Sequence, residues 1–162
     1  MERLRDRLGG DDSADATAEY VVLGAGGVGV SIANGLRAAG HTVRLVGEQQ
    51  SSTGLPGVAG APDDRRVLER AGLTERSTVV VATPRDRRNL LVAGLVRSRF
   101  EVADCLVLVN APDRMDAVAA ADLEGFCVTS ELSAAVVDRL TDRASETGVE
   151  VGHERRETRR SS

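Results

Sequence analysis

This sequence is short of aromatic residues. Aromatic side chains make up 2% of its 162 residues, and tryptophan is absent. The core therefore has to be built from Val, Leu, Ile and Ala, which favours α/β layers with buried parallel strands. The shortage also argues against a surface on which the bases of single-stranded nucleic acid stack.

Lysine is missing altogether, since all 21 basic residues are arginine. Its absence excludes the lysine of a P-loop and every Schiff-base mechanism. With 25 acidic residues the formal net charge is −4, which argues against a broad face for polyanions. We therefore expect no nucleic acid among the partners.

Cysteine and histidine are scarce, with two of each. Cys105 and Cys127 lie far apart in apolar runs and predict reduced core thiols, not a disulfide or a metal site. His41 and His153 also lie apart, so no zinc site is expected. His153, near the C-terminus, is the one loose candidate for acid–base chemistry.

Long apolar runs are absent too. No stretch approaches the roughly 18 apolar residues of a membrane span. The charged start "MERLRDRLGG", whose first eight residues are a helix candidate, lacks the apolar segment of a signal peptide. These absences predict a soluble, cytoplasmic protein without direct membrane insertion.

What the sequence does contain is an alternation of short apolar bursts and stretches of helical periodicity. The expected strands are 20–23, 42–46, an abbreviated one near Val58, 77–83, 105–110 and 126–130. The expected helices are 28–40, 64–72 (capped by Asp63 or Asp64), 84–98 (with Leu91 on its apolar side), 113–125 and 130–146. This alternation predicts a single α/β domain with a doubly wound, Rossmann-type parallel sheet.

The stretch "YVVLGAGGVGVSIANGL" places Gly24, Gly26 and Gly29 in the pattern G-x-G-x-x-G, directly after a strand and opening a helix. In a dinucleotide site the first glycine permits the tight turn, the second lets the backbone approach a pyrophosphate, and the third allows close helix packing. The predicted phosphate loop comprises Gly24, Ala25, Gly26, Gly27, Val28 and Gly29. The alternative is that these glycines only let the helix lie close to the sheet.

The second half of such a fingerprint is an acidic residue that binds the ribose hydroxyls. Glu48 lies 19 residues after Gly29, close to the expected spacing of about 20. Gly47 stands where the strand is expected to end, so Glu48 either reaches the ribose or is a solvated surface charge. Arg44, within the strand, is not well placed to bind a 2′-phosphate.

From Tyr20 to about Leu140, roughly three quarters of the chain resembles the TrkA-N domain. This domain, also called the KTN or N-terminal RCK domain, is the regulatory nucleotide-binding module of potassium transporters and channels. Beyond the glycine loop, "DDRRVLERAGLTERSTVVVATPRDRRNLL" is similar to the family's helix, "AGL" turn, fourth strand and Thr/Asp/Asn run. "LVNAPDRMDAVAAADLEGFCVTSELSAAVV" is similar to its fifth strand, N-x-P loop, sixth strand and crossover helix.

The resemblance implies binding of NAD(H) or ATP/ADP and assembly into a homo-oligomer, either a dimer or a ring. By position, Gly24–Gly29 would hold the phosphates and Glu48 would stand in for the ribose acid. Thr83, at the mouth of the fourth strand, would line the pocket, and Asp86 and Asn89 would order the loop and the helix start. Alternatively, these last three residues are helix caps.

The chain departs from the family pattern in several places. "QQSSTGLP" nearly deletes the helix between the second and third strands, and no TrkA-C-type domain follows in the sequence. Gly60-Ala61 replaces Gly-Asp after the third strand, and Leu108 replaces an arginine common in the fifth. These changes weaken the adenosine side of the pocket and leave the phosphate loop whole. Weak or altered nucleotide binding is therefore an open alternative.

The sequence predicts a regulatory subunit, not an enzyme. About twenty residues follow the sheet, too few for a substrate domain, and no catalytic constellation or metal cluster is visible. We expect no catalytic or metal-binding residues and a subunit that reports nucleotide state to a membrane potassium transporter or channel. The alternatives are a small NAD(P)-dependent oxidoreductase and a degenerate assembly module without nucleotide.

The expected organisation has three parts. Residues 1–18 form a charged extension and linker, 19–146 form the TrkA-N/RCK-type nucleotide-binding domain, and 147–162 form a charged tail. The helix 130–146 is the candidate element for the homo-oligomer, although its apolar stripe could equally pack on the chain's own sheet. Through its partner the protein would lie at the inner face of the cell membrane.

Overall fold

The fold comes from a computed structural model that describes residues 19–147. The chain divides into two compact units, one ending at Val128 and the other beginning at Thr129. The helix expected at 1–8, His153 and the tail beyond residue 147 lie outside the described residues. The three-part organisation expected from the sequence stays a prediction.

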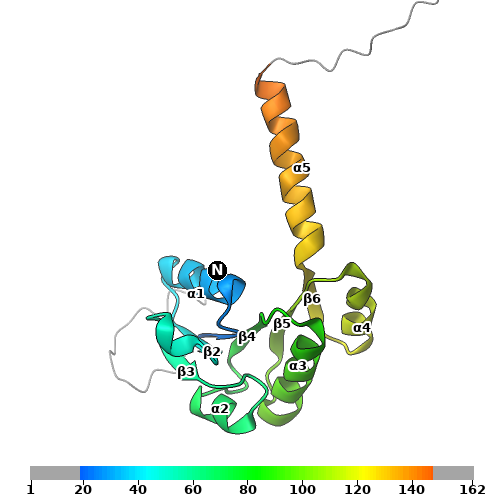
Figure 1. The fold of residues 1–162 in the computed structure, drawn as a ribbon. Coiled ribbons are helices and arrows are strands. Elements are labelled where there is room, and N and C mark those ends of the chain that lie inside the picture. The colour runs from blue at the N-terminus through cyan, green and yellow to red at the C-terminus, as the bar shows by residue number, and fades with distance from the viewer. Residues whose placement is uncertain (1–18, 148–162) are drawn as a thin grey trace, which may run out of the picture. The chain divides into compact units, whose positions relative to one another are not determined.

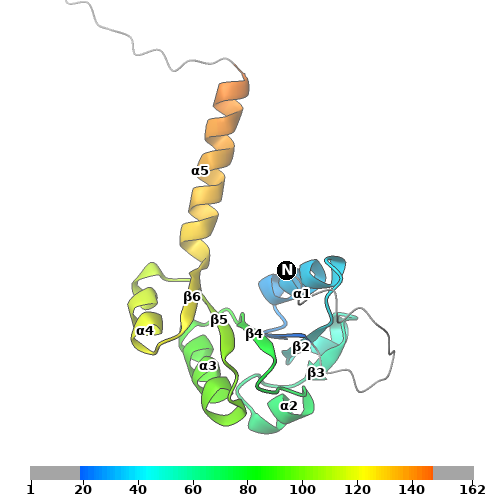
Figure 2. The same cartoon turned by 180° about the vertical axis from the view of Figure 1, so that it is seen from behind.

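The first unit contains a six-stranded sheet in the order β3-β2-β1-β4-β5-β6, and every pair of neighbouring strands is parallel. The strands are β1 (Tyr20–Leu23), β2 (Val43–Gly47), β3 (Gly57–Ala59), β4 (Thr78–Val81), β5 (Asp104–Val109) and β6 (Glu124–Cys127). The helical elements of this unit are α1 (Gly27–Ala38), η2 (Gln50–Ser52), α2 (Arg65–Arg70), α3 (Asp86–Phe100), η3 (Pro112–Arg114) and α4 (Met115–Ala120). This doubly wound sheet confirms the predicted fold class (Figures 1 and 2).

The order of the strands reverses between β1 and β4. Leu23, the last residue of β1, lies level with Val46 on one side and Val81 on the other. The loops that follow β1, β2 and β4 therefore leave the sheet at the same edge. In open α/β sheets, a crevice for ligands forms outside the strand ends at such a switch point.

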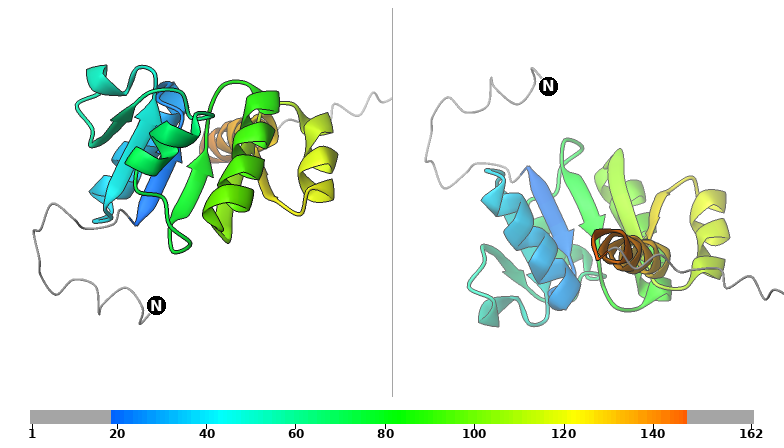
Figure 3. Two further views of the ribbon diagram at one scale, coloured as in Figure 1. Left: turned by 90° about the horizontal axis from the view of Figure 1, so that it is seen from below. Right: turned by 90° about the horizontal axis from the view of Figure 1, so that it is seen from above.

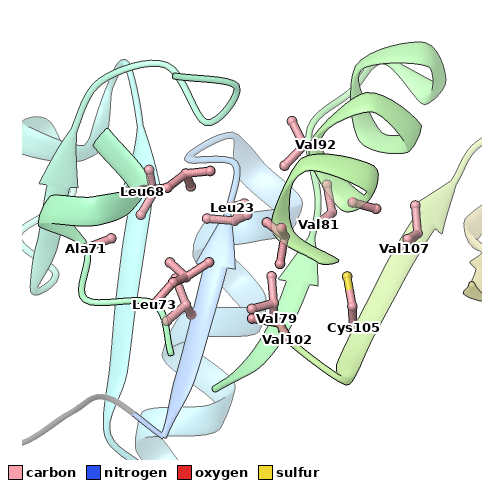
Figure 4. Close-up of a cluster of buried hydrophobic side chains, with 14 of the residues drawn as sticks. Leu23, Leu68, Ala71, Leu73, Val79, Val81, Val92, Val102, Cys105 and Val107 are labelled. Carbon is pink, nitrogen blue, oxygen red and sulfur yellow. The ribbon is translucent and has the colours of Figure 1, made fainter. Parts of the chain in front are cut away.

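Branched aliphatic side chains fill the space on both faces of the sheet. Figure 3 shows α1 on one face and α2 with α3 on the other. The larger cluster, drawn in Figure 4, joins Leu23 of β1, Leu68 of α2, Val81 of β4 and Val92 of α3, each of which is fully buried. The smaller cluster, on the α1 face, includes the fully buried Ala33 of α1. Burial on both faces explains why the central strands are apolar throughout.

Three details of the sequence prediction are wrong. The helix expected at 113–125 ends at Ala120, and the last two residues of that range belong to β6. The last strand is β6, not 126–130, because the turn at Asp122 (φ +55°) starts the strand early, at Glu124. Its polar first residue and Gly125 give no apolar signal for a strand. A Cβ on Gly125 would lie 2.8 Å from Val118 Cγ1, so glycine suits the close packing against α4. Leu91 is 63% exposed. The buried side of α3 is formed by Asn89, Val92, Ala93 and Val96.

The helix α5 (Val128–Glu146) continues into the second unit, and none of its described residues is buried. Leu132, Val136, Val137 and Leu140 are exposed by 62%, 49%, 60% and 57%. Their spacing of four, one and three residues places them on one face of the helix. Among residues 19–147 we find no helix whose length and apolar character would let it cross a bilayer.

Candidate functional site

A cleft of about 450 Å³ lies at the switch point. The glycine loop contributes Gly24, Ala25 and Gly26 to its lining, the chain after β2 contributes Glu48 and Gln49, and the segment after β4 contributes Thr83, Pro84, Arg85 and Arg88. The cleft therefore forms where three strand ends meet, as the parallel topology requires. Its volume is within the range of small-molecule sites, roughly 300–1,000 Å³.

The glycines of the loop have different structural roles. Gly24 has φ +131°, and a Cβ there would lie 2.6 Å from the carbonyl oxygen of Ala82. A Cβ on Gly29 would lie 1.8 Å from the carbonyl oxygen of Gly24. At Gly26 and Gly27, however, a Cβ would meet nothing within 4 Å. The first and third glycines of the motif are thus needed for packing, whereas the second leaves open space beside the backbone.

Gly47 explains why β2 ends with a glycine before the acidic residue. A Cβ on Gly47 would lie 2.5 Å from the Cβ of Ala25 in the glycine loop. The absence of a side chain therefore lets the end of β2 approach the loop. As a result Glu48, one residue later, lies in the lining of the same cleft as Gly24 and Gly26.

The N-terminus of α1 opens at the glycine loop. Gly26 is the N-cap residue, with extended backbone, and its carbonyl oxygen accepts the first helical hydrogen bond from Val30 N at 2.9 Å. Among the described residues, no side chain caps this helix end, and its first turn contains no acidic residue. The N–H groups of the first turn and the positive end of the helix dipole are thus suited to an anion.

A buried hydrogen-bond network fixes Thr83, which is 5% exposed. Asn89, which is fully buried, accepts from Thr83 N through Oδ1 at 3.0 Å. Its Nδ2 donates to the carbonyl oxygens of Thr83 and Leu108, both at 2.9 Å. The Thr83 hydroxyl also contacts Asn89 Oδ1. Asn89 therefore joins the ends of β4 and β5 and orders the loop, as the family resemblance implied.

Asp86 ties the first turn of α3 to the loop after β5. Its carboxylate accepts from the backbone N–H groups of Asn110 at 2.8 Å and Ala111 at 3.0 Å. Burial opposes its ionisation, but these bonds and the Asn110 side-chain amide outweigh that effect and lower the pKa of Asp86. The carboxylate thus binds a neighbouring loop, while the N-cap position of α3 is occupied by Arg85.

Glu48 is held by an arginine that the sequence did not single out. Arg88 Nη2 lies 2.5 Å from Glu48 Oε1 and 3.1 Å from Asp63 Oδ1. The hydrogen bond from Arg88 lowers the pKa of each carboxyl, and the one to Glu48 raises the pKa of Arg88. The cap of α2 is Asp64, which accepts from Arg66 N at 2.8 Å, so Asp63 is left to pair with Arg88.

The structure brings together five of the eight predicted site residues. Gly24, Ala25, Gly26, Glu48 and Thr83 line the cleft. The other three, Gly27, Val28 and Gly29, form the first turn of α1 beside it. The lining residues that the sequence prediction did not include are Gln49, Pro84, Arg85 and Arg88. Asp63, expected only as a helix cap, pairs with Arg88 beside them. The signal that could have found Arg88 is its place in the first turn of the helix after Thr83.

His41 and Cys105 are not among the residues that line the cleft. His41 Nδ1 is 3.1 Å from Glu19 Oε2, at the amino ends of the strands. Burial raises the pKa of the Cys105 thiol to about 11. Within residues 19–147 no group of three or more His, Cys, Asp and Glu side chains is placed to hold a metal ion. The cleft is therefore the strongest candidate for a site.

Comparison with known proteins decides the family. The family model of the TrkA-N domain matches residues 20–125, which include the first five strands, the start of β6 and the complete cleft. The chain belongs to the TrkA-N domain family. The matched part of this TrkA-N domain contains the glycine loop, the end of β4 and the Asp86/Asn89 segment, on which the sequence resemblance rested.

Two curated relatives of this TrkA-N domain are potassium uptake proteins. It is 27% identical over 130 residues to a "Trk system potassium uptake protein TrkA homolog" from Methanothermobacter thermautotrophicus, covering 76% of this chain and 60% of the relative. It is 28% identical over 103 residues to a "Trk system potassium uptake protein TrkA" from Streptomyces coelicolor, covering 59% and 46%. The chain thus spans about half the length of these relatives.

A solved structure shares the fold. The NAD(P)-binding domain of an exopolyphosphatase-related protein from Archaeoglobus fulgidus is 25% identical, with a TM-score of 0.67. The match covers 77% of this chain and 98% of that domain. The TrkA-N domain described here therefore has the same Rossmann-like architecture as a domain described as binding NAD(P).

Proposed function

We propose that this TrkA-N domain is a non-catalytic regulatory domain of a potassium uptake system and that it binds NAD(H) or an adenine nucleotide, ATP or ADP. The observation that carries the proposal is the cleft at Gly26, where open space adjoins an uncapped helix N-terminus. The names of the two relatives support potassium uptake. The NAD(P)-binding domain of similar fold supports the ligand class.

The side chains present fit a nucleotide laid across the strand ends. The diphosphate would lie against the backbone of Gly24–Gly29, with the positive end of α1 stabilising its charge. The ribose would lie near Glu48, whose side chain is 55% exposed and carries a second carboxylate oxygen beside the one that Arg88 binds. Thr83 would line the pocket between them, held by Asn89.

A regulatory role is supported by the chemistry of the lining. Its ionisable side chains are Glu48, Arg85 and Arg88, and two of these are paired with each other. The Thr83 hydroxyl is bound by Asn89, so it is poorly placed to act as a nucleophile. The described lining thus offers no pair of nucleophile and general base. Binding without turnover is the function that this arrangement supports best.

Partners are proposed on separate grounds. The exposed apolar face of α5, formed by Leu132, Val136, Val137 and Leu140, supports pairing with another copy of this chain in a dimer or ring. Nucleotide bound at the glycine loop would bias that assembly between two arrangements. A membrane potassium transporter or channel subunit would respond to the change. The protein would act in the cytoplasm, at the inner face of the membrane.

Calorimetric titration with NADH, NAD⁺, ATP and ADP tests the nucleotide proposal. The informative variant is Gly26→Asp, because Asp is a favourable N-cap residue and fits the extended backbone there. We expect this variant to be as stable as the wild type or slightly more stable. Its affinity should nevertheless fall at least about tenfold, since the new carboxylate occupies the phosphate position and repels it.

Gly35→Asp is the matched control. Gly35 also lies in α1, and a Cβ added there would meet nothing within 4 Å, but it is remote from the cleft lining. We expect it to keep wild-type affinity and to change the free energy of unfolding by less than about 1 kcal/mol, since the gain in helix propensity opposes the effect of an acid near the helix C-terminus. If the wild type binds none of the four nucleotides, or if Gly26→Asp binds as tightly as the wild type, the proposed nucleotide function is wrong.

The oligomer is tested by light scattering after gel filtration. Leu132→Ser and Leu140→Ser together polarise the exposed face of α5 without touching a buried residue. We expect the wild type to be a dimer or larger and the double variant to dissociate at micromolar concentration. The control variant, Glu131→Ser with Arg139→Ser, removes two charged side chains from the same helix. We expect this variant to stay associated. A monomeric wild type would overturn this part of the proposal.

A further inference from the structure

The contact between Arg88 and two carboxylates has a consequence for ligand choice. One nitrogen, Nη2, bonds both Glu48 Oε1 and Asp63 Oδ1. The three residues come from three different segments: Glu48 follows β2, Asp63 precedes α2, and Arg88 lies in the first turn of α3. We call these three residues the Arg88 trio. It joins those segments beside the cleft, whose lining includes Glu48 and Arg88.

The Arg88 trio carries a net charge. Two carboxylates and one guanidinium sum to one negative charge. The pKa of each carboxyl is lowered by its bond to Arg88, so both stay ionised near neutral pH. An arginine near the ribose can accommodate a 2′-phosphate, but the charge of Arg88 is already neutralised. Of the ionisable side chains in the cleft lining, Glu48 and Arg88 are paired with each other, and Arg85 is exposed. Arg88 therefore offers no free charge to a 2′-phosphate placed beside Glu48.

The carboxylate of Glu48 is held in place by Arg88. Glutamate has three rotatable bonds, and an exposed glutamate loses rotamer freedom when a ligand fixes it. Arg88 holds one carboxylate oxygen at 2.5 Å, and the Arg88 side chain is itself only 25% exposed. Asp63 Oδ1 bonds the same nitrogen of Arg88, Nη2, at 3.1 Å. The carboxylate of Glu48 is thus ordered before a ligand arrives.

We propose that Arg88, braced by Asp63, is a positioning residue that orients Glu48 toward a ribose diol, and that the Arg88 trio makes the cleft select nucleotides with an unphosphorylated 2′-hydroxyl. The inference rests on the proposed nucleotide function and extends it to the ligand class. A 2′-phosphate, with close to two negative charges at neutral pH, would lie beside the Glu48 carboxylate, while Arg88 is already paired with Glu48 and Asp63.

Two pairs of ligands test the inference by calorimetry on the full chain: NADH against NADPH, and AMP against adenosine 2′,5′-bisphosphate. We expect the wild type to prefer the unphosphorylated member of a pair by about tenfold or more. Arg88→Gln should weaken NADH about three- to tenfold, since Glu48 is no longer held. Arg88→Lys should recover part of that loss. Arg87→Gln, an exposed neighbour on α3, is the matched control and should leave the affinities unchanged.

The decisive variant removes the carboxylates and keeps the arginine. In Glu48→Gln with Asp63→Asn, Arg88 has lost both charged partners and can pair with a 2′-phosphate. We expect the ratio of the two affinities to move at least about tenfold toward NADPH. A merely structural role for the trio would lower both affinities and leave their ratio unchanged. Circular dichroism confirms that each variant is folded.

Four results overturn the inference. The first three are equal affinity of the wild type for both members of a pair, an unchanged ratio in the double variant, and an effect of Arg87→Gln as large as that of Arg88→Gln. A wild type that binds none of the four ligands overturns it as well. In that case calorimetric titration with ATP and ADP tests the proposed nucleotide function separately. If either still binds, the nucleotide function stands and only the role of the Arg88 trio is wrong.

Discussion

Replacing Gly29 by alanine should disrupt the junction between β1 and α1. The added Cβ would lie 1.8 Å from the carbonyl oxygen of Gly24, a backbone atom that cannot rotate away. The two atoms have to separate by more than about 1 Å, which places the variant at the upper end of the usual overpacking cost, about 3 kcal/mol. Alanine recovers about 1 kcal/mol of helix propensity. We expect a net loss of about 2 kcal/mol in the free energy of unfolding.

Gly35→Ala is the internal standard for this experiment. Gly35 lies in the same helix, and a Cβ there would meet nothing within 4 Å. The same substitution should therefore stabilise the protein by about 1 kcal/mol, and the two variants should differ by about 3 kcal/mol. Urea unfolding followed by circular dichroism suits a protein without tryptophan. At a slope near 1.5 kcal/mol/M the two midpoints should lie about 2 M apart.

The outcome that would refute this reasoning is a Gly29→Ala variant whose midpoint equals or exceeds that of the wild type. The close approach of α1 to the glycine loop would then be incorrect, and with it the placing of the helix N-terminus at the cleft. A loss of similar size in both alanine variants would also contradict it, because the contact with Gly24 is the difference between the two sites.

Three further predictions follow from the structure. Asn89→Ala should lower the free energy of unfolding by about 2–4 kcal/mol, since it leaves Thr83 N and the Leu108 carbonyl buried without their partner. The pKa of Asp86 is lowered in the folded state, so its carboxylate stabilises the fold above its ordinary pKa, 3.8, and this contribution disappears as the pH falls through the lower folded value. The stability gap between wild type and Asp86→Asn should therefore be widest at pH 7 and narrow toward pH 3. Cys105, with a thiol pKa of about 11, should react with Ellman's reagent at pH 8 about a hundredfold more slowly in the folded than in the unfolded protein.

Each of these three predictions has a control variant or a result that would contradict it. Asn34→Ala, on the exposed side of α1, should cost less than about 0.5 kcal/mol, and a similar loss in both asparagine variants would contradict the buried network. A stability gap for Asp86→Asn that is constant from pH 7 to 3 would contradict the role given to its carboxylate. A Cys127→Ser background isolates Cys105, and fast native labelling would show that this thiol is not buried.

The sheet could be predicted from the sequence because its strands are short apolar runs. "YVVL" and "STVVVAT" are buried on both faces, so a continuous run of apolar residues marks each strand. The start of β6 does not fit this pattern, since Glu124 and Gly125 are not apolar. The strand is defined by pairing with β5 and by close packing against α4, which are contacts between distant segments.

The site was predictable only in part, for a similar reason. Local spacing is sufficient to find the glycine loop and Glu48. It cannot show that Gly29 packs against Gly24 while Gly26 faces open space, because that depends on the path of the helix. It also cannot show that Arg88 reaches Glu48, 40 residues earlier in the chain. Such a pair depends on three loops leaving the sheet at one edge.

Nucleotide binding at the glycine loop can be tested by titrating the ¹⁵N-labelled protein with NADH, and with ATP, and observing the backbone amides. We expect the largest shifts at the amides of Gly26, Gly27 and Gly29, with smaller ones at Glu48 and Thr83. The amides around Cys105, at the opposite ends of the strands, should stay unchanged. Saturating nucleotide that leaves the glycine amides in place, or that shifts residues near Cys105 instead, would contradict nucleotide binding at the glycine loop.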